Sequence, residues 1–509
     1  MRVVKRIISV LLVTVLAISL SACSSSSKGS SSGNTGSSTD QADKSYTKIV
    51  YAFVSFNNIP EDTKEVEEEI NKITREKIGV EVELMPLSIS EYSKQVSLAM
   101  QGGDQIDVFH SLGDFNQSIA SNQAYDITDI IDSCAPETKE LIGDTWLEAT
   151  GKEGKIYGIP AYKPIALQPM FIYRSDIAEE SGIDMTKVSS IYDLTQVFEK
   201  VKEKYPDMTP LIPVNPGDSG MTRCVPEVDY LTDDYLSPKG VLMSDNTTVL
   251  DYYSTDEFKN LCSLTRTWYN EGLILQDAAT TTSTSTELMS SGNAFGYIAS
   301  YSYPTKDTAA SLKSQVGYDL GAAALGEAFL DTTAINAITW MVSSTSKNPE
   351  AALKFLNLTY SEPDVVNLII YGLEGKDYVK NEDGSVSYPE GLDASTVPYT
   401  AQLSCGIVGN QFIQNYMEGV DPASLDWELE QNKNARTSAA MGFTFDASKV
   451  KVEYSTVVNV INQYLPALSC GSVDPEKELP KFIERLKEAG LDTIIQEKQA
   501  QLDSWLANK

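Results

Sequence analysis

Histidine is almost absent from this 509-residue chain, in which His110 is the only one. A Ser-His-Asp triad, a Cys-His pair or a histidine-rich metal site would each have to use that single side chain. The patterns GxSxG, HExxH, CxxC and GxGxxG, the P-loop and the calcium-binding loop DxDxDG are missing as well. Among 71 acidic residues a pair of carboxylates arises by chance, so glycosidase chemistry stays open without a motif to support it. We therefore expect no catalytic residue and no cofactor, and we name no metal ligand, while binding of a calcium ion stays open.

Basic residues are also scarce. Lysine and arginine total 40 against 71 aspartates and glutamates, which leaves a formal net charge of −31. A nucleic-acid-binding surface needs clustered positive charge for the phosphates, so this composition argues against nucleic acid as a partner. Five cysteines remain after Cys23, an odd number at spacings that suggest no disulfide framework.

Long apolar runs are missing except at the amino terminus. A short basic region, residues 2–6, precedes an apolar run over 7–20, which is shorter than the roughly 18 residues that a membrane-spanning helix needs. Leu20-Ser21-Ala22-Cys23 then resembles a bacterial lipobox. The pattern predicts a signal peptide over 1–22 and acylation of Cys23. The alternative is a plain signal peptide with an incidental cysteine.

Residues 23–45 are dominated by serine and glycine and contain too little apolar surface to fold. A flexible coil of this length spans roughly 25 Å. We interpret it as a tether that holds a folded body at the outer face of the cell membrane, anchored by the lipid on Cys23.

Strands and helices alternate at the start of the body. Residues 48–55, 80–87 and 106–112 are expected as strands, with amphipathic helices between them. This alternation is typical of a doubly wound parallel sheet, whose ligands bind beyond the carboxyl ends of the strands. The residues at those ends are the first site candidates: Phe56, Asn57, His110 and Asp114. Asn57 and Asp114 are equally interpretable as helix caps, and His110 as an ordinary loop residue.

The rest of the chain continues the α/β pattern without internal repeats. An extended, proline-containing run over 154–175 leads into a helix, and a strand over 332–345 precedes helices over 347–372. Helices are also expected over 192–208, 256–274 and 474–506, and a hairpin turn over 380–391.

Several segments resemble one family, the extracellular solute-binding lipoproteins of ABC importers that include maltose-binding proteins. The resemblance rests on the order and spacing of "GKIYGIP", "MFIYRSDIAEESGI", "SGNAFGYIASYSYP", "AITWMVSSTSKNPEAALKFLN", "YGLEGKDYV" and "GNQFI", and on the closing helical segment. It implies the type II periplasmic-binding-protein fold, with two doubly wound α/β lobes, a hinge and a ligand cleft between them. It also implies a membrane permease as partner and a carrier that binds and releases without catalysis.

This resemblance also implies a division of the chain. Lobe 1 is expected over 46–161 plus about 336–372, and lobe 2 over 162–335 plus about 373–440. A carboxyl-terminal extension, 441–509, is expected to pack on the lobes.

The cleft residues that the resemblance suggests come from both lobes and from the crossovers. The candidates are Tyr301 and Tyr303 as aromatic stacking residues, Tyr162, Lys163 and Gln168 at the first crossover, Trp340 at the return crossover, and Asn410 and Gln411. Trp340 is equally interpretable as a core residue.

We therefore expect a monomeric, lipid-anchored carrier of a small-molecule solute, an oligosaccharide in the leading hypothesis. Sugars present apolar ring faces and hydroxyl rims, which the 26 tyrosines and five tryptophans suit. The alternatives are a peptide or another organic solute in the same architecture, a cell-surface glycoside-active enzyme, and an adhesin.

Overall fold

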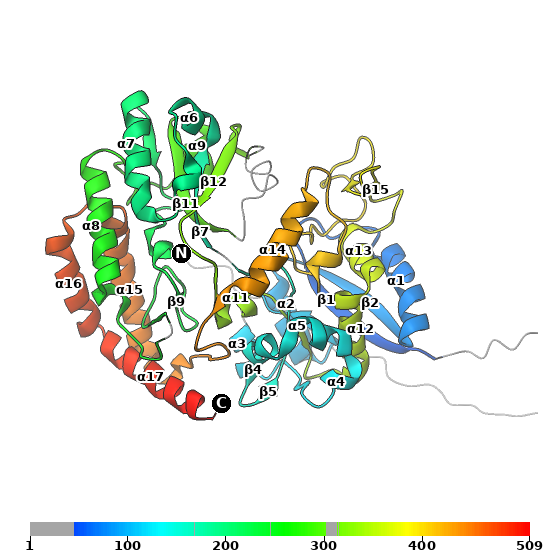
Figure 1. The fold of residues 1–509 in the computed structure, drawn as a ribbon. Helices are drawn as coiled ribbons and strands as arrows, with labels where there is room; N and C mark the ends of the chain where they lie inside the picture. The colour runs from blue at the N-terminus through cyan, green and yellow to red at the C-terminus, as the bar shows by residue number, and fades with distance from the viewer. Residues whose placement is uncertain are drawn as a thin grey trace, which may run out of the picture. The chain divides into compact units, whose positions relative to one another are not determined.

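The computed structural model describes residues 45–508 except 114, 167, 245, 302–312 and 314. Two β-sheets organise this part of the chain, each with its own helices (Figure 1). Cys23, Asp114, Tyr303 and the side chain of Tyr301, all predicted above, lie outside the described residues. No helix in the described part of the chain combines the length and apolarity needed to cross a bilayer.

The first sheet has the strand order β2-β1-β3-β14-β6. Its strands are β1 (Thr47–Ser55), β2 (Val80–Ser88), β3 (Val108–His110), β14 (Thr339–Val342) and β6 (Ile159–Pro160). The first three strands are parallel, as the alternation in the sequence predicts. β14 returns from the far part of the chain and inserts antiparallel between β3 and β6.

The helices of the first lobe bury one face each against this sheet or against one another. α1, for example, buries Val66, Ile70 and Thr74, which recur at a spacing of four residues. The helices are α1 (Thr63–Lys77), α2 (Tyr92–Gly102), α3 (Phe115–Ala120), α4 (Ile131–Cys134), α5 (Pro136–Ala149), α12 (Pro349–Ser361) and α13 (Pro363–Tyr371); a hairpin pairs β4 (Gly151–Lys152) with β5 (Lys155–Ile156).

The second sheet is mixed, with the order β12-β7-β11-β8. β7 pairs antiparallel with both β11 and β12, and β8 pairs parallel with β11. A Cβ atom at Gly296 in β11 would lie 2.3 Å from the carbonyl oxygen of Ile172, so the close approach of β11 to β7 requires glycine there. The strands are β7 (Gln168–Arg174), β8 (Thr209–Leu211), β11 (Ala294–Tyr301) and β12 (Leu320–Ala324), and the short strands β9 (Val228–Asp229) and β10 (Leu242–Met243) pair separately.

Two helical layers cover the second lobe. The helices within the lobe are α6 (Ser175–Glu180), α7 (Leu194–Lys204), α8 (Asp256–Asn270) and α9 (Ser285–Ser290). α15 (Lys451–Ser469) and α16 (Pro475–Glu488) both pack against α8, and α17 (Leu491–Ala507) packs on α15 (Figure 1). The carboxyl-terminal extension therefore belongs to the core of the second lobe, which it shares through Phe482, Leu491 and Leu502.

The segment after α13 differs from its predicted place. We expected residues 373–440 in the second lobe, yet Tyr378, Val386 and Tyr399 are buried in the core of the first lobe. The physical reason is the burial of these side chains in the apolar core of the first lobe. The Tyr399 hydroxyl also donates to the Ile369 carbonyl in α13 at 2.9 Å. The segment contains β15 (Val379–Lys380) and β16 (Val386–Ser387) and ends in α14 (Pro422–Asn434).

Residues 332–345 also differ from the single strand expected there. α11 (Thr332–Asn336) occupies the first part, and only Thr339–Val342 form β14. Asp331 explains the helix, since its carboxylate caps the first turn by accepting a hydrogen bond from the Ala334 N–H at 2.8 Å.

A buried ion network ties α17 to the second lobe. The Lys498 side chain is fully buried, and its ammonium donates to Asp233 Oδ2 at 2.7 Å and to the Gly240 carbonyl at 2.9 Å. Lys239, also buried, lies 3.6 Å from the same carboxylate and 4.2 Å from the ring of Tyr454. A buried carboxylate with two cationic partners is stabilised only while those partners stay in place, so this network fixes the extension on the lobe.

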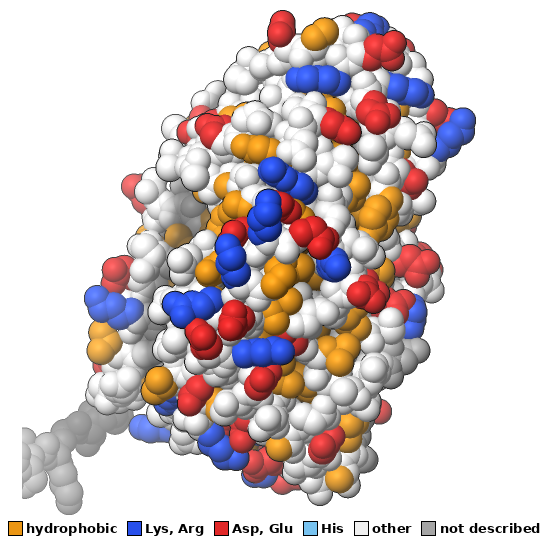
Figure 2. Space-filling model, turned by 90° about the vertical axis from the view of Figure 1, so that its left-hand side faces the viewer, with side chains coloured by type: hydrophobic (Ala, Val, Ile, Leu, Met, Phe, Trp, Pro, Cys, Tyr) orange, Lys and Arg blue, Asp and Glu red, His pale blue; other side chains and the backbone are white. Residues whose placement is uncertain are grey.

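On the surface of the second lobe, charged side chains form exposed ion pairs instead of a buried network. Figure 2 shows the side that α16 and α8 cover in Figure 1, where basic and acidic side chains alternate. On α16 they pair one turn apart, as in Lys481–Glu478 and Arg485–Glu488, with distances of 2.8 and 2.7 Å. These exposed pairs contribute little to stability.

Candidate functional site

The carboxyl edge of the first sheet gathers most of the predicted first-lobe site. β1, β2 and β3 run in one direction, and β6 runs with them because β14 is antiparallel to both β3 and β6. The residues that follow these strands, Phe56, Ile89, Ser111 and Tyr162, therefore emerge at one edge. This is the edge where open α/β sheets bind ligands.

Exposed apolar side chains lie at this edge. Of eight large hydrophobic side chains exposed in the described residues, four are here: Phe56 (38%), Ile59 (48%), Ile89 (44%) and Leu392 (37%). We call these four residues the edge patch. Solvent-facing apolar groups that gather at a ligand-binding edge suit the apolar face of a sugar ring.

Backbone hydrogen bonds hold the loops of the edge patch together. The Phe56 N–H donates to the Ala401 carbonyl at 3.0 Å, and the Asn57 side-chain amide donates to the Ala394 carbonyl. The Ile89 N–H donates to the Ser55 carbonyl at 3.1 Å. The segment around residues 392–401 is thus fastened beside the end of β1. Asn57 positions this loop with its side chain.

Three crossovers connect the two sheets. The first runs from β6 to β7, the second from β12 to β14, and the third follows α14. The second and third pair with each other as parallel strands, β13 (Phe329–Leu330) and β17 (Arg436–Thr437). Gln168 begins β7 opposite Tyr301, the last residue of β11, so the first crossover arrives at the edge of the second sheet where these two residues lie.

Asn432, at the end of α14, binds the first crossover. Its side-chain oxygen accepts hydrogen bonds from the N–H groups of Ile165 and Ala166 at 2.9 and 3.1 Å. Its side-chain nitrogen donates to the Lys163 carbonyl at 2.6 Å. Asn432 is 5% exposed, so these bonds are protected from water. The crossover and α14 are thereby joined at the point where the chain passes between the sheets.

Tyr162 and Gln411 form the neighbouring contact. The Tyr162 N–H donates to the Gly409 carbonyl at 2.7 Å, and its carbonyl accepts from the Gln411 N–H at 2.8 Å. The Tyr162 ring packs between Trp146 and Phe412, with centroid distances of 5.7 and 5.4 Å. Partial burial raises the pKa of its hydroxyl. Tyr162 is 8% exposed, so it supports the site mainly by packing and backbone bonding.

Lys163 follows Tyr162 and is partly buried. Its aliphatic stem covers Gly406, where an added Cβ would lie 2.8 Å from the Lys163 Cβ. Desolvation lowers the pKa of its ammonium. Among the described residues its ammonium has no ion-pair partner, so Lys163 offers its donors to water or to a ligand.

Three predicted site residues belong to the core instead. Trp340 is fully buried, stacks on Tyr51 at 4.7 Å between ring centroids, and donates its indole N–H to the Ile407 carbonyl at 2.7 Å. Asn410 is 5% exposed and donates its side-chain amide to the Tyr360 carbonyl at 3.2 Å. His110 is 2% exposed. The polar side-chain groups of Trp340 and Asn410 are bonded to protein groups, whereas His110, although buried, lines a pocket of the first lobe.

His110 is enclosed by aromatic rings on two sides. Its ring stacks on Tyr92 at 4.5 Å and meets Trp340 edge-on at 4.6 Å. The Val54 N–H donates to Nε2 at 3.2 Å, and Nδ1 lies 3.1 Å from the Ser111 carbonyl, so Nδ1 carries the proton in the neutral ring. Burial lowers the pKa of His110 to about 4.

Sequence reasoning missed Ile59, Leu392 and Asn432. Ile59 and Leu392 are single apolar residues in polar loops, "NNIPED" and "PEGLDAS", a weak signal that could have been noticed. Asn432 gave none, because an asparagine near a helix end is ordinary in sequence and only the tertiary structure brings the crossover to it. In the described ranges no group of three or more His, Cys, Asp or Glu side chains is arranged to hold a metal ion.

Comparison with known proteins gives matches along most of the chain. A family model described as bacterial extracellular solute-binding protein matches residues 57–365. A model described as a domain of unknown function, DUF3502, matches residues 439–507. A carbohydrate ABC transporter substrate-binding protein from Streptococcus pneumoniae is 27% identical over 486 residues, covering 93% of this chain and 94% of its own.

Solved structures share the fold. The N-glycan transport solute binding protein NgtS from Streptococcus pneumoniae superposes with a TM-score of 0.74 at 24% identity, covering 91% of this chain and 99% of its own. An HMO binding, ABC-transporter associated solute binding protein from Bifidobacterium longum infantis superposes with a TM-score of 0.59 at 18% identity, covering 90% of this chain and 99% of its own. The predicted fold class, a two-lobed periplasmic-binding-protein fold, is therefore confirmed.

Replacing Asn432 by alanine should loosen the first crossover. The change removes both acceptor bonds to Ile165 and Ala166, so hydrogen exchange in a peptide covering 163–168 should accelerate at least tenfold. The free energy of unfolding should fall by about 1–3 kcal/mol. Asn434→Ala, at an exposed position of the same helix, is the control. Equal exchange in both variants would contradict the assigned clamp.

His110 should make the protein acid-sensitive in a defined range. An unfolded histidine titrates near pH 6.5 and the folded one near 4, so between these values only the unfolded chain binds the proton. Stability is fully present above pH 6.5 and falls by about 3 kcal/mol on acidification to pH 4. Urea unfolding at several pH values in this range gives the free energy of unfolding, which should fall with acidification more steeply in wild type than in His110→Gln. NMR of the single imidazole reports its charge. A ring protonated at pH 6 would refute this.

Proposed function

This chain belongs to the bacterial extracellular solute-binding protein family, and we propose that it captures an oligosaccharide and delivers it to an ABC importer. The observation that carries the proposal is the edge patch, which places four exposed apolar side chains at the carboxyl edge of the first sheet. The match to a carbohydrate ABC transporter substrate-binding protein over 93% of the chain supports a sugar as the cargo. It also supports a membrane permease as the partner of this monomeric carrier.

In the proposed mechanism the sugar first contacts the first lobe. Its apolar ring faces pack on the edge patch, and Lys163 and Gln411 supply hydrogen bonds to hydroxyl groups. The crossovers then bend, so that the edge of the second sheet, where Gln168 lies, meets the other side of the ligand. Such closure removes the apolar surface from water, and opening at the permease releases the cargo.

A carrier needs no chemical step. It needs only reversible binding, which neutral donors and apolar faces provide without a nucleophile. His110, the single histidine, is enclosed by Tyr92 and Trp340 and takes no part in the proposed binding. A panel of glycans separates a carrier from an enzyme. Thermal shift without turnover supports the carrier, whereas catalytic cleavage of any glycan, or binding of peptides alone, contradicts the proposal.

Anchoring is a second part of the proposal. The lipobox-like Leu20-Ser21-Ala22-Cys23 directs acylation of Cys23, and the Ser/Gly segment after it tethers the body to the outer face of the membrane. Cys23→Ser should shift the protein from the membrane fraction to the medium of a Gram-positive host and abolish incorporation of labelled palmitate. Membrane retention of this variant would refute the anchor.

Phe56→Ala should weaken binding of the best glycan from the panel about 10- to 100-fold, because the ring loses an apolar face buried against the sugar, roughly 1.5–3 kcal/mol. Isothermal titration calorimetry measures the change. The matched control is Tyr192→Ala, which removes an aromatic side chain from the second lobe. Tyr192 is 51% exposed, more than Phe56 at 38%. Wild-type affinity in the Phe56 variant would remove the edge patch from the site.

A further inference from the structure

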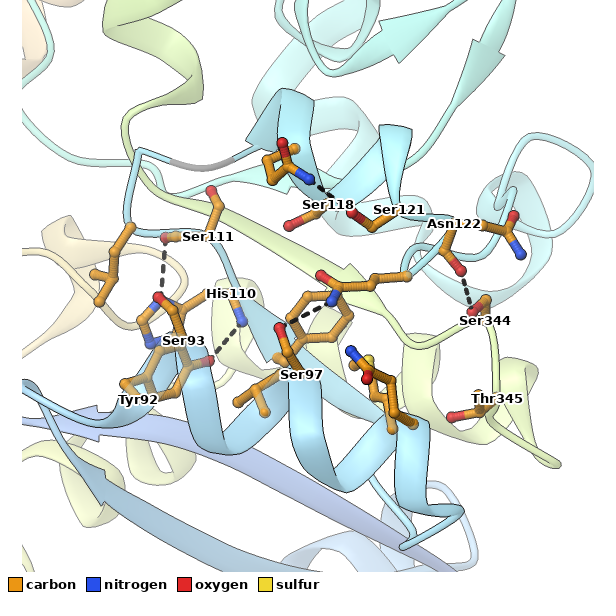
Figure 3. A pocket seen from close by; sticks show the side chains of 17 residues that line it. Tyr92, Ser93, Ser97, His110, Ser111, Ser118, Ser121, Asn122, Ser344 and Thr345 are labelled. Carbon is orange, nitrogen blue, oxygen red and sulfur yellow. Dashed lines mark hydrogen bonds between the residues drawn. The ribbon is translucent and has the colours of Figure 1, made fainter.

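The first lobe contains a pocket that the edge patch does not include. It lies between α2 and α3 and has a volume of about 310 Å³ (Figure 3). Its lining comes from residues 92–123 together with Ser344 and Thr345, so the second lobe contributes nothing to it. One end is formed by Ser111 and Leu112, at the carboxyl edge of β3. Ser344 and Thr345 follow β14, which is antiparallel to β3, so the pocket extends from the edge that carries the proposed oligosaccharide site toward the opposite edge of the sheet.

The lining of this pocket is uncharged. Charged residues make up 22% of the chain, yet none of the residues around the pocket is Asp, Glu, Lys or Arg. Of the lining residues, only His110 has an ordinary pKa close to neutral pH. Burial lowers its pKa to about 4, so the ring is uncharged at pH 7. A ligand that bears a full charge would lose its hydration here without gaining an ion-pair partner.

The pocket lining mixes apolar side chains with hydroxyl and amide groups. Phe109 and Met100 supply apolar surface, while Ser97 and Gln123 supply polar groups. The Gln123 side-chain amide donates to Ser97 Oγ at 3.0 Å, which fixes both groups (Figure 3). Apolar surface together with oriented hydroxyl and amide groups suits a sugar ring.

Ser118 adds a further hydroxyl group to the lining. The residue is 6% exposed and reaches the pocket from α3. Its hydroxyl can donate a hydrogen bond to, or accept one from, water or a ligand in the pocket.

We propose that this pocket binds one uncharged sugar unit of the cargo through the first lobe alone. The volume lies at the small end of ligand pockets, which suits one ring and excludes a longer chain. The inference rests on the proposed function for the identity of the cargo. It adds a place where one unit is held while the remaining units lie over the edge patch, before the second lobe takes part.

Blocking the pocket tests this inference. Ser93 is exposed on α2 and lines the pocket, so Ser93→Trp places an indole at its mouth without disturbing the core. Gln95→Trp puts the same ring on the same helix outside the pocket and is the control. Affinity for the best glycan of the panel should fall at least tenfold in Ser93→Trp and stay unchanged in Gln95→Trp. Ser121→Trp places the same ring in the pocket from outside α2. If Ser93→Trp fails to fold, this second variant still tests the pocket.

A second measurement reads the pocket directly. The Met100 methyl group, labelled with ¹³C, should shift on titration of the full chain with millimolar glucose, mannose or N-acetylglucosamine. It should stay unshifted with glucuronate or glucosamine, whose charges the lining does not match. Both Trp variants at the pocket should abolish the shift.

The outcomes separate the two proposals. A glycan that binds wild type and both pocket variants equally overturns the pocket and leaves the carrier function standing. A Met100 shift with glucuronate as large as that with glucose overturns the neutral specificity. Absence of any glycan binding removes the proposed cargo, and the monosaccharide titration then decides the pocket by itself.

Discussion

The insertion of β14 between β3 and β6 is the constraint on which this molecule depends. Trp340 pairs with His110 on one side, and Thr339 pairs with Pro160 on the other. β14, which returns from the second lobe, therefore pairs with β6, from which the first crossover departs. Two crossovers are fixed by one set of main-chain hydrogen bonds, and their ends cannot drift when the segments between them bend.

The side chains of this insertion explain why the sheet edge is rigid. Trp340 stacks on Tyr51 of β1 and meets His110 of β3, and Tyr92 of α2 stacks on the other face of His110. The Tyr92 hydroxyl accepts from the His110 N–H at 2.9 Å. Aromatic burial thus joins three strands and a helix of the first lobe. A ligand surface on such a support is preorganised, which lowers the entropy lost on binding.

Charge is separated from the proposed binding surfaces. Charged side chains along α16 form exposed ion pairs, and the buried Lys498 is paired with Asp233. The edge patch is apolar, and the pocket between α2 and α3 has an uncharged lining. A neutral, hydroxyl-rich cargo suits both surfaces, because neither would leave a ligand charge unpaired.

The sequence by itself determined the alternation of strands and helices in the first lobe, since hydrophobic periodicity is local, and it indicated the sheet edge that Phe56 and Tyr162 share. It also indicated the relationship to binding proteins through the order of short segments. Tertiary structure alone decided that Trp340, Asn410 and His110 are core residues, that 373–434 cover the first lobe, and that Asn432 clamps the crossover. Burial depends on which distant surfaces meet, and residues such as Asn432 and Lys163 are separated by hundreds of positions that no local pattern spans.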